Sequence, residues 1–139
     1  MSDVTSIQID AVILDMPIEY RDRFQELLQK PTLTVDDLRG QVEQYTATVK
    51  RVSRMVRLLD IDRALALSHS ASSLIDFIEA DHPPAIKMLI QAAVHYFIFE
   101  EEDEEVTGVL GFDDDVCVMN AVSRAIGRID LVLPIKQRT

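Results

Sequence analysis

Cysteine and glycine are scarce in this sequence, and each shortage narrows what the chain can be. Cys117 is the only cysteine, so the chain can form neither an intramolecular disulfide nor a zinc site built from several cysteines. Nothing in this usage indicates an oxidising compartment, and we expect a cytoplasmic protein. Only four glycines are present, and none belongs to a phosphate-binding glycine loop.

Positive charge and long apolar runs are also in short supply. The chain has 14 Lys and Arg residues against 24 Asp and Glu residues, a formal net charge of -10. Because sequence-independent binding to nucleic acid or to an anionic membrane depends on a cationic surface, we expect neither. The most apolar stretch, residues 85–99, has 15 residues where a spanning helix needs about 20, so we predict no transmembrane segment. Residues 1–16 lack the basic start of a secretion signal, and no cleaved leader is expected.

The apolar residues that are present have the spacing of α-helices. They recur three and four positions apart rather than two, and 47% of the 139 residues are hydrophobic, which is enough for the core of one domain. We predict an all-α, single-domain bundle of about five helices over residues 1–139. Residues 1–16 are either a short helix or an N-terminal arm, and 131–139 form a C-terminal tail. Helices over 85–99 and 114–128 are expected to form a hairpin.

The most regular pattern lies in a long helix that Thr34 is expected to cap. Its apolar positions alternate three and four residues apart, as in a coiled-coil seam, and are Val35, Leu38, Val42, Tyr45, Val49, Val52, Val56 and Leu59. The flanking positions lack the paired opposite charges that select a coiled-coil partner. The seam therefore indicates either a bundle helix packed within one chain or the interface of a homodimer.

Negative charge is concentrated between the last two predicted helices. Residues 100–105 are six consecutive acids, and residues 100–115 hold nine of the chain's 24 acids. No Lys or Arg lies between Lys87 and Arg124, so neighbouring positions supply no counter-charge. Such a segment is either solvated by water and salt, neutralised by a divalent cation, or neutralised by a basic surface of this chain or of a partner.

The cation alternative can be compared with a calcium-binding loop. In residues 103–114, oxygen ligands stand at the first, third, fifth and twelfth positions and Gly108 at the sixth. The pattern departs from a calcium-sensor loop at Thr107 and at Asp114, which replaces the usual bidentate Glu. If a calcium, magnesium or manganese site exists, its expected ligands are Asp103, Glu105, Asp114 and Asp115. The two aspartates that open the last helix also have a structural explanation, because acids stabilise a helix N-terminus.

The basic alternative has a candidate surface within the chain. It consists of the cationic residues of the long helix and of the start of the next one: Arg39, Lys50, Arg51, Arg54, Arg57 and Arg63. Paired arginine and carboxylate groups on an exposed surface would add only about 0 to 1 kcal/mol each, so their effect would be on orientation.

The region from about residue 93 to 125 resembles the YkvA-like family of small bacterial proteins of unknown function. In that family a helix ending in an aromatic residue leads into an acidic, proline-containing turn and then a Gly-aromatic-x-Asp-Asp element that opens an apolar helix. The matching residues here are His95, Tyr96, Gly111, Phe112, Asp114 and Asp115. In the turn, this chain has a run of acids where the family has prolines and spaced aspartates. The resemblance implies a helical module, and the family has no established activity to transfer.

Few residues are arranged for catalysis. His69, His82 and His95 lie on three different segments, Cys117 lies in an apolar helix after three acids, and no Gly-x-Ser-x-Gly surrounds any serine. His95 shares a polar stripe with Lys87 and Gln91, at intervals of four residues, which indicates a core or boundary histidine. A carboxylate cluster at the acidic turn could still supply a general acid, so enzymatic activity stays open but is not favoured.

These observations predict a non-enzymatic helical interaction module. Its acidic turn would engage the basic surface of a protein partner, or of another copy of the chain in a homo-oligomer. The alternative is a divalent-cation-binding domain, structural or hydrolytic, that uses the same turn.

Overall fold

The computed structural model describes residues 3–53, 61–78, 84–98 and 113–133, and this part of the chain is built from helices with no strand. The prediction of an all-α bundle is confirmed, with one helix more than expected. The elements are α1 (Asp3–Asp15), α2 (Ile18–Leu28), α3 (Val35–Ser53), α4 (Ile61–Ile78), α5 (Pro84–Ile98), α6 (Asp113–Ala125) and a 3-10 turn, η1 (Ile129–Leu131).

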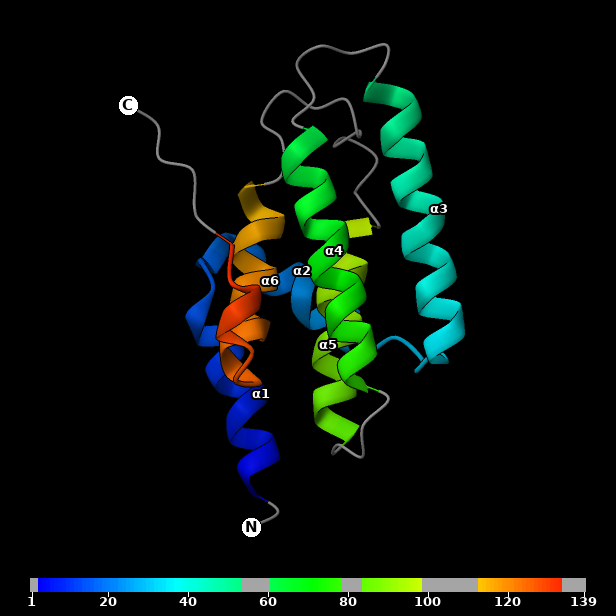
Figure 1. Cartoon of the computed structure of the whole chain (residues 1–139). Coiled ribbons are helices and arrows are strands. Elements are labelled where there is room, and N and C mark those ends of the chain that lie inside the picture. The colour runs from blue at the N-terminus through cyan, green and yellow to red at the C-terminus, as the bar shows by residue number, and fades with distance from the viewer. Residues whose placement is uncertain (1–2, 54–60, 79–83, 99–112, 134–139) are drawn as a thin grey trace, which may run out of the picture.

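Helix α5 is the centre of the bundle, and the other five helices pack around it (Figure 1). Every residue from Leu89 to Ile98 is buried. Because a helix that is apolar over most of its surface needs neighbours on most sides, its composition explains this central place. In the described ranges no helix combines the length and the apolar character needed to cross a membrane.

Proline and threonine set where the helices begin. Pro17 precedes α2 and Pro84 is the first residue of α5, positions where a missing backbone N–H costs nothing. Thr34 caps α3, as predicted: its hydroxyl accepts a hydrogen bond from the N–H of Asp37 at 3.1 Å. Gly127 ends α6 with a φ of +83°, while the N–H of Arg128 donates to the carbonyl of Ser123 at 2.8 Å. The helix therefore stops three residues before the predicted boundary.

The regular seam of α3 is buried within the chain. Leu38, Val42, Tyr45 and Val49 are all buried, and α3 packs against α4 and α5. The ring of Tyr45 meets that of Phe97 edge-to-face, with centroids 4.8 Å apart. Up to Val49 the seam is therefore used in intramolecular packing. The side chains of Val52, Val56 and Leu59 lie outside the described ones.

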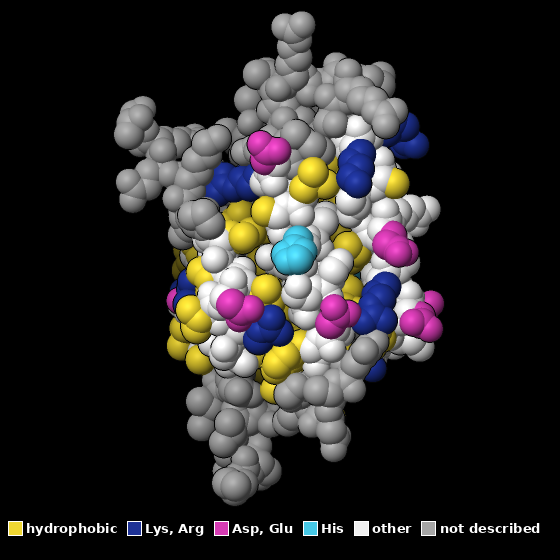
Figure 2. All heavy atoms as spheres, viewed as in Figure 1, with side chains coloured by type: hydrophobic (Ala, Val, Ile, Leu, Met, Phe, Trp, Pro, Cys, Tyr) yellow, Lys and Arg dark blue, Asp and Glu magenta, His cyan; other side chains and the backbone are white. Residues whose placement is uncertain are grey.

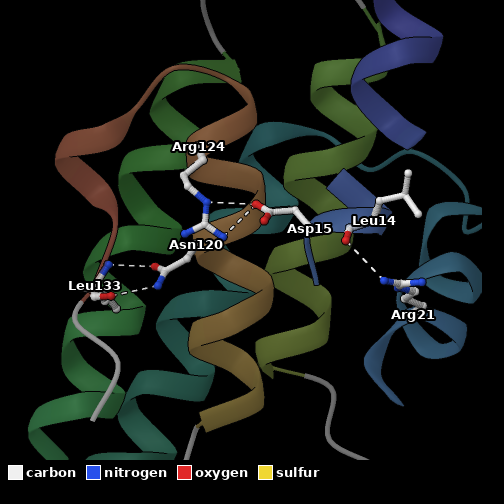
Figure 3. A network of polar contacts seen from close by, with 6 residues as sticks. All are labelled: Leu14, Asp15, Arg21, Asn120, Arg124 and Leu133. Carbon is white, nitrogen blue, oxygen red and sulfur yellow. Dashed lines mark hydrogen bonds and ion pairs between the residues drawn. The ribbon is translucent and has the colours of Figure 1, made fainter. Parts of the chain in front are cut away.

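Both ends of the described chain are held on α6. The segment at residues 1–16, predicted as either an arm or a short helix, forms α1, which packs on α6. Asp15 joins the two helices, because the Nε and Nη2 of Arg124 donate to the Oδ2 of Asp15 at 2.9 and 2.8 Å (Figure 3). At the other end, the side-chain amide of Asn120 both accepts from the N–H of Leu133 and donates to its carbonyl, each at 2.8 Å. The expected tail thus begins as a docked segment as far as residue 133. Residues 134–139 lie outside the described part.

Candidate functional site

The four predicted cation ligands are only partly covered by the structure. Asp103 and Glu105 lie outside the described residues, and Asp114 is the second residue of α6, with a side chain outside them too. Asp115 is described, and its side chain is only 5% exposed. Within the described ranges, no three His, Cys, Asp or Glu side chains gather as metal ligands would.

The burial of Asp115 fits its position in the first turn of α6. A carboxylate there faces the positive end of the helix dipole and the free N–H groups of the first turn. This is the structural explanation that the sequence already provides, and it accounts for an acid at this position without a ligand.

The basic residues nearest to the acidic segment in sequence lie far from the ends of the two helices to which that segment is attached. Lys87 is in the first turn of α5, eleven residues before Ile98, and Arg124 is in the last turn of α6, eleven residues after Asp113. At 1.5 Å per residue, each is about 16 Å along its helix from the point where the acidic segment is attached. That separation is about twice the Debye length at physiological ionic strength. Arg124 is moreover bound to Asp15.

The predicted basic surface of α3 and α4 divides between the two ends of the bundle. Arg39, near the start of α3, forms an ion pair with Asp76 of α4. Lys50 and Arg51 are in the last turn of α3, at the end of the bundle where α4 and α6 start and α5 finishes (Figure 1). Arg54 and Arg57 lie outside the described residues. Lys50 and Arg51 thus lie at the end of the fold to which the acidic segment is attached.

A second polar site lies on the stripe of α5, where Gln91 and His95 are each 3% exposed. The amide of Gln91 reaches the α2–α3 loop: its Oε1 accepts from the N–H of Leu33 and its Nε2 donates to the carbonyl of Pro31, both at 2.8 Å. One turn later, the Nε2 of His95 lies 3.0 Å from the Oε1 of Gln41 on α3. The stripe therefore fastens α5 to both the loop and α3.

The chemistry of His95 follows from this geometry. An amide oxygen can only accept, so with this placement of the Gln41 amide the Nε2 of His95 carries the proton. Burial lowers the pKa of His95 below its ordinary value of 6.5, and the positive charge of Lys30 lowers it further. At neutral pH the imidazole is therefore held as the neutral form.

A cavity of about 250 Å³ opens beside this cluster, lined by Lys30, Pro31, Leu33, Gln41 and His95. It lies where the α2–α3 loop, α3 and α5 meet. Lys30 stands among the exposed residues, whereas His95 is buried, so the cavity leads from the surface to the imidazole.

A wider groove of about 430 Å³ runs between α3 and α4 and contains Ser68 and His69. The hydroxyls of Ser68 and Thr46 lie 2.9 Å apart, so Ser68 is engaged in linking the two helices. Figure 2 shows the face covered by α4, where acidic and basic side chains are interspersed among apolar ones. On this face, the described residues form neither an activated serine nor a patch of one charge.

Comparison of the chain with protein-family models, with curated proteins and with solved structures gave no match. The similarity of residues 93 to 125 to the YkvA-like family stays a prediction from the sequence. The functional argument therefore rests on the residues themselves.

Sequence reasoning identified half of the second site. The stripe of Lys87, Gln91 and His95 was visible at intervals of four residues, but its partners were not. Gln41 is 54 positions from His95, and Pro31 is 60 positions from Gln91. No local pattern marks Gln41 or Lys30 as a neighbour of α5, because only the packing of α3 and of the α2–α3 loop brings them there.

Proposed function

We propose that the protein is a non-enzymatic helical interaction module whose acidic segment, residues 100–105, binds a basic surface of another protein. The observation that carries the proposal is the charge arrangement around this segment. Six consecutive acids are attached between the ends of α5 and α6, while Lys87 and Arg124 stand at the opposite ends of those helices. Like charges at this density favour a bound cationic group over an empty surface.

The packing of the two flanking helices supports a docking role. The last ten residues of α5 are all buried, and Asp115 and Val116 in the first turn of α6 are buried too. A segment attached at both ends to rigid helices presents its charges from a defined place on the bundle. Less freedom is then lost on binding than for a charged chain end, which favours affinity.

The experiment compares two variants with the same net charge. In the first, Glu100, Glu101, Glu102 and Glu104 are changed to Gln; each change removes one negative charge and keeps the size of the side chain. In the control, four exposed acids on α1, α2 and α3 are changed to the corresponding amides, Asn or Gln: Asp10, Asp22, Glu26 and Glu43. Both sets of changes bring the net charge from -10 to -6.

Binding of a fluorescent arginine-rich peptide would be followed by anisotropy at low and at physiological salt. We expect the first variant to lose at least about tenfold in affinity and most of its salt dependence, while the control stays within about threefold of the native chain. Equal losses in both variants would show that only net charge matters, and would refute the proposal. A further variant has Arg51, Arg54 and Arg57 changed to Gln. If this variant binds the peptide more tightly than the native chain does, these arginines compete with the peptide for the acids.

The second proposal is a divalent-cation site formed by Asp103, Glu105, Asp114 and Asp115. The burial of the Asp115 carboxylate favours it, since ligands of a bound cation are shielded from water. A cation that binds only the folded state should stabilise it by about 2.7 kcal/mol at 100 times its dissociation constant. Thermal unfolding of metal-stripped protein with calcium, magnesium or manganese would measure this, with an Asp114→Asn and Asp115→Asn variant as control. A shift equal to that of matched ionic strength would exclude the site.

A further inference from the structure

The cavity beside His95 is built by polar contacts that hold its walls in place. On one side, Gln91 holds the α2–α3 loop through two hydrogen bonds of 2.8 Å, which positions Pro31 and Leu33. On the other, Gln41 is fixed by its contact with His95 at 3.0 Å. Gln91 and His95 of α5 therefore both take part in shaping the space between the loop and α3.

The groups that line the cavity differ in chemistry along its depth. Pro31 and Leu33 provide apolar surface from the loop. Lys30 brings an ammonium group, and among the described residues it has no carboxylate partner. Gln41 uses its amide oxygen on His95, so its Nε2 keeps two N–H donors, and no described residue accepts a hydrogen bond from them. The lining thus combines one cationic side chain and one amide with donors to spare, beside the His95 imidazole and the apolar loop residues.

The size of the space limits what it can hold. A volume of about 250 Å³ equals about eight water molecules at their share of liquid volume, about 30 Å³ each. It lies just below the range of about 300 to 1,000 Å³ that is typical of sites for drug-sized ligands. A compact molecule of about ten non-hydrogen atoms would fill it.

We propose that this cavity binds a small organic monocarboxylate with a compact apolar body. The carboxylate would accept hydrogen bonds from the Lys30 ammonium and from the Gln41 amide, and the body would lie against Pro31 and Leu33. A doubly charged or strongly hydrated anion is disfavoured, because the loop side of the cavity offers it no donors and would strip its water. The site is distinct from the acidic segment, so this proposal stands apart from the proposed function.

Benzoate is a suitable probe, with benzamide as a neutral molecule of the same shape. The readout is the change of backbone and imidazole NMR signals during titration to about 20 mM, with sodium chloride matched throughout. We expect saturable shifts at Leu33, Gln41 and His95, and binding of benzamide at least about fivefold weaker.

The Lys30→Met variant keeps the apolar stem of the side chain and removes its charge. It should weaken benzoate binding at least about fivefold and leave benzamide binding unchanged. The control is Lys87→Met, which makes the same change on α5, two turns before His95 and outside the cavity lining. Lys30 is exposed, so its replacement should leave the fold intact, and the spectrum of the variant without ligand verifies this. Absence of saturable shifts at the three residues, or equal affinity of the two Met variants for benzoate, would overturn the proposal.

Discussion

Gln91 offers a sharp test of how the bundle is held together, through the replacement Gln91→Leu. Leu is close to Gln in size and is a good helix former, so it should preserve α5 and fill nearly the same space. The change removes the side-chain amide that accepts from the N–H of Leu33 and donates to the carbonyl of Pro31. What it perturbs is therefore the link between α5 and the α2–α3 loop.

The magnitude can be worked out from these two hydrogen bonds. Each contributes about 0.5 to 1.5 kcal/mol net, and a buried group left without a partner costs about 1 to 3 kcal/mol. Pro31 is exposed and Leu33 is half-buried, so water can reach part of the loop and replace some of what is lost. We expect the free energy of unfolding to fall by about 1 to 3 kcal/mol, less than the full burial penalty for two groups would give.

Urea denaturation followed by far-ultraviolet circular dichroism would measure the change in unfolding free energy. The matched control is Gln44→Leu on the exposed side of α3, where a change within about 0.5 kcal/mol is expected. Amide hydrogen exchange adds a local readout, because the N–H of Leu33 should lose protection while the N–H groups inside α5 keep theirs. If the Gln91→Leu variant is as stable as the control and the N–H of Leu33 is still protected from exchange, Gln91 does not hold the α2–α3 loop on α5.

Three further predictions concern single side chains. The folded-state pKa of His95 lies below its unfolded value near 6.5, so the folded chain binds fewer protons than the unfolded chain. The stability that the neutral imidazole contributes is present above about pH 6.5 and should be lost as the pH falls from 6.5 through the folded-state pKa, by at most about 1.4 kcal/mol per pH unit. Urea unfolding at several pH values would show this extra slope in the native chain and not in His95→Gln. Thr34→Ala should cost about 1 kcal/mol by calorimetry and Thr34→Ser almost nothing, and equal losses would exclude the cap. Asp15 and Arg124 form a half-exposed ion pair, so a double-mutant cycle with Asp15→Asn and Arg124→Gln should give a coupling energy of only about 0 to 1 kcal/mol. A larger coupling energy would contradict the expectation that water weakens this pair.

The helices were predictable where local signals are strong. Pro17, Thr34 and Pro84 act on the backbone next to them, so the starts of α2, α3 and α5 could be read directly. The start of the chain was ambiguous because α1 has little amphipathic character of its own. Its helical form is stabilised by packing on α6 and by the ion pair of Asp15, contacts with residues more than 100 positions away.

The sites could be predicted less completely than the helices. The sequence marked Asp115 as part of an acidic region, but its burial depends on how α6 packs in the bundle. It likewise marked His95 and Gln91 as a stripe on an apolar helix, without indicating what that stripe faces. A cavity is a property of several segments at once, so no single segment predicts it.

The sequence by itself determined the all-α class, the scarcity of basic residues and the concentration of acids between the last two helices. These follow from composition and from spacing over a few residues, which act locally. Tertiary structure alone decided that the seam of α3 is buried within the chain as far as Val49 and that α1 and residue 133 are held on α6. It also decided that Gln91 and His95 meet the α2–α3 loop and Gln41. The physical reason is that these hydrogen bonds join residues 13 to 109 positions apart, and they exist only when the burial of apolar surface has brought the segments together.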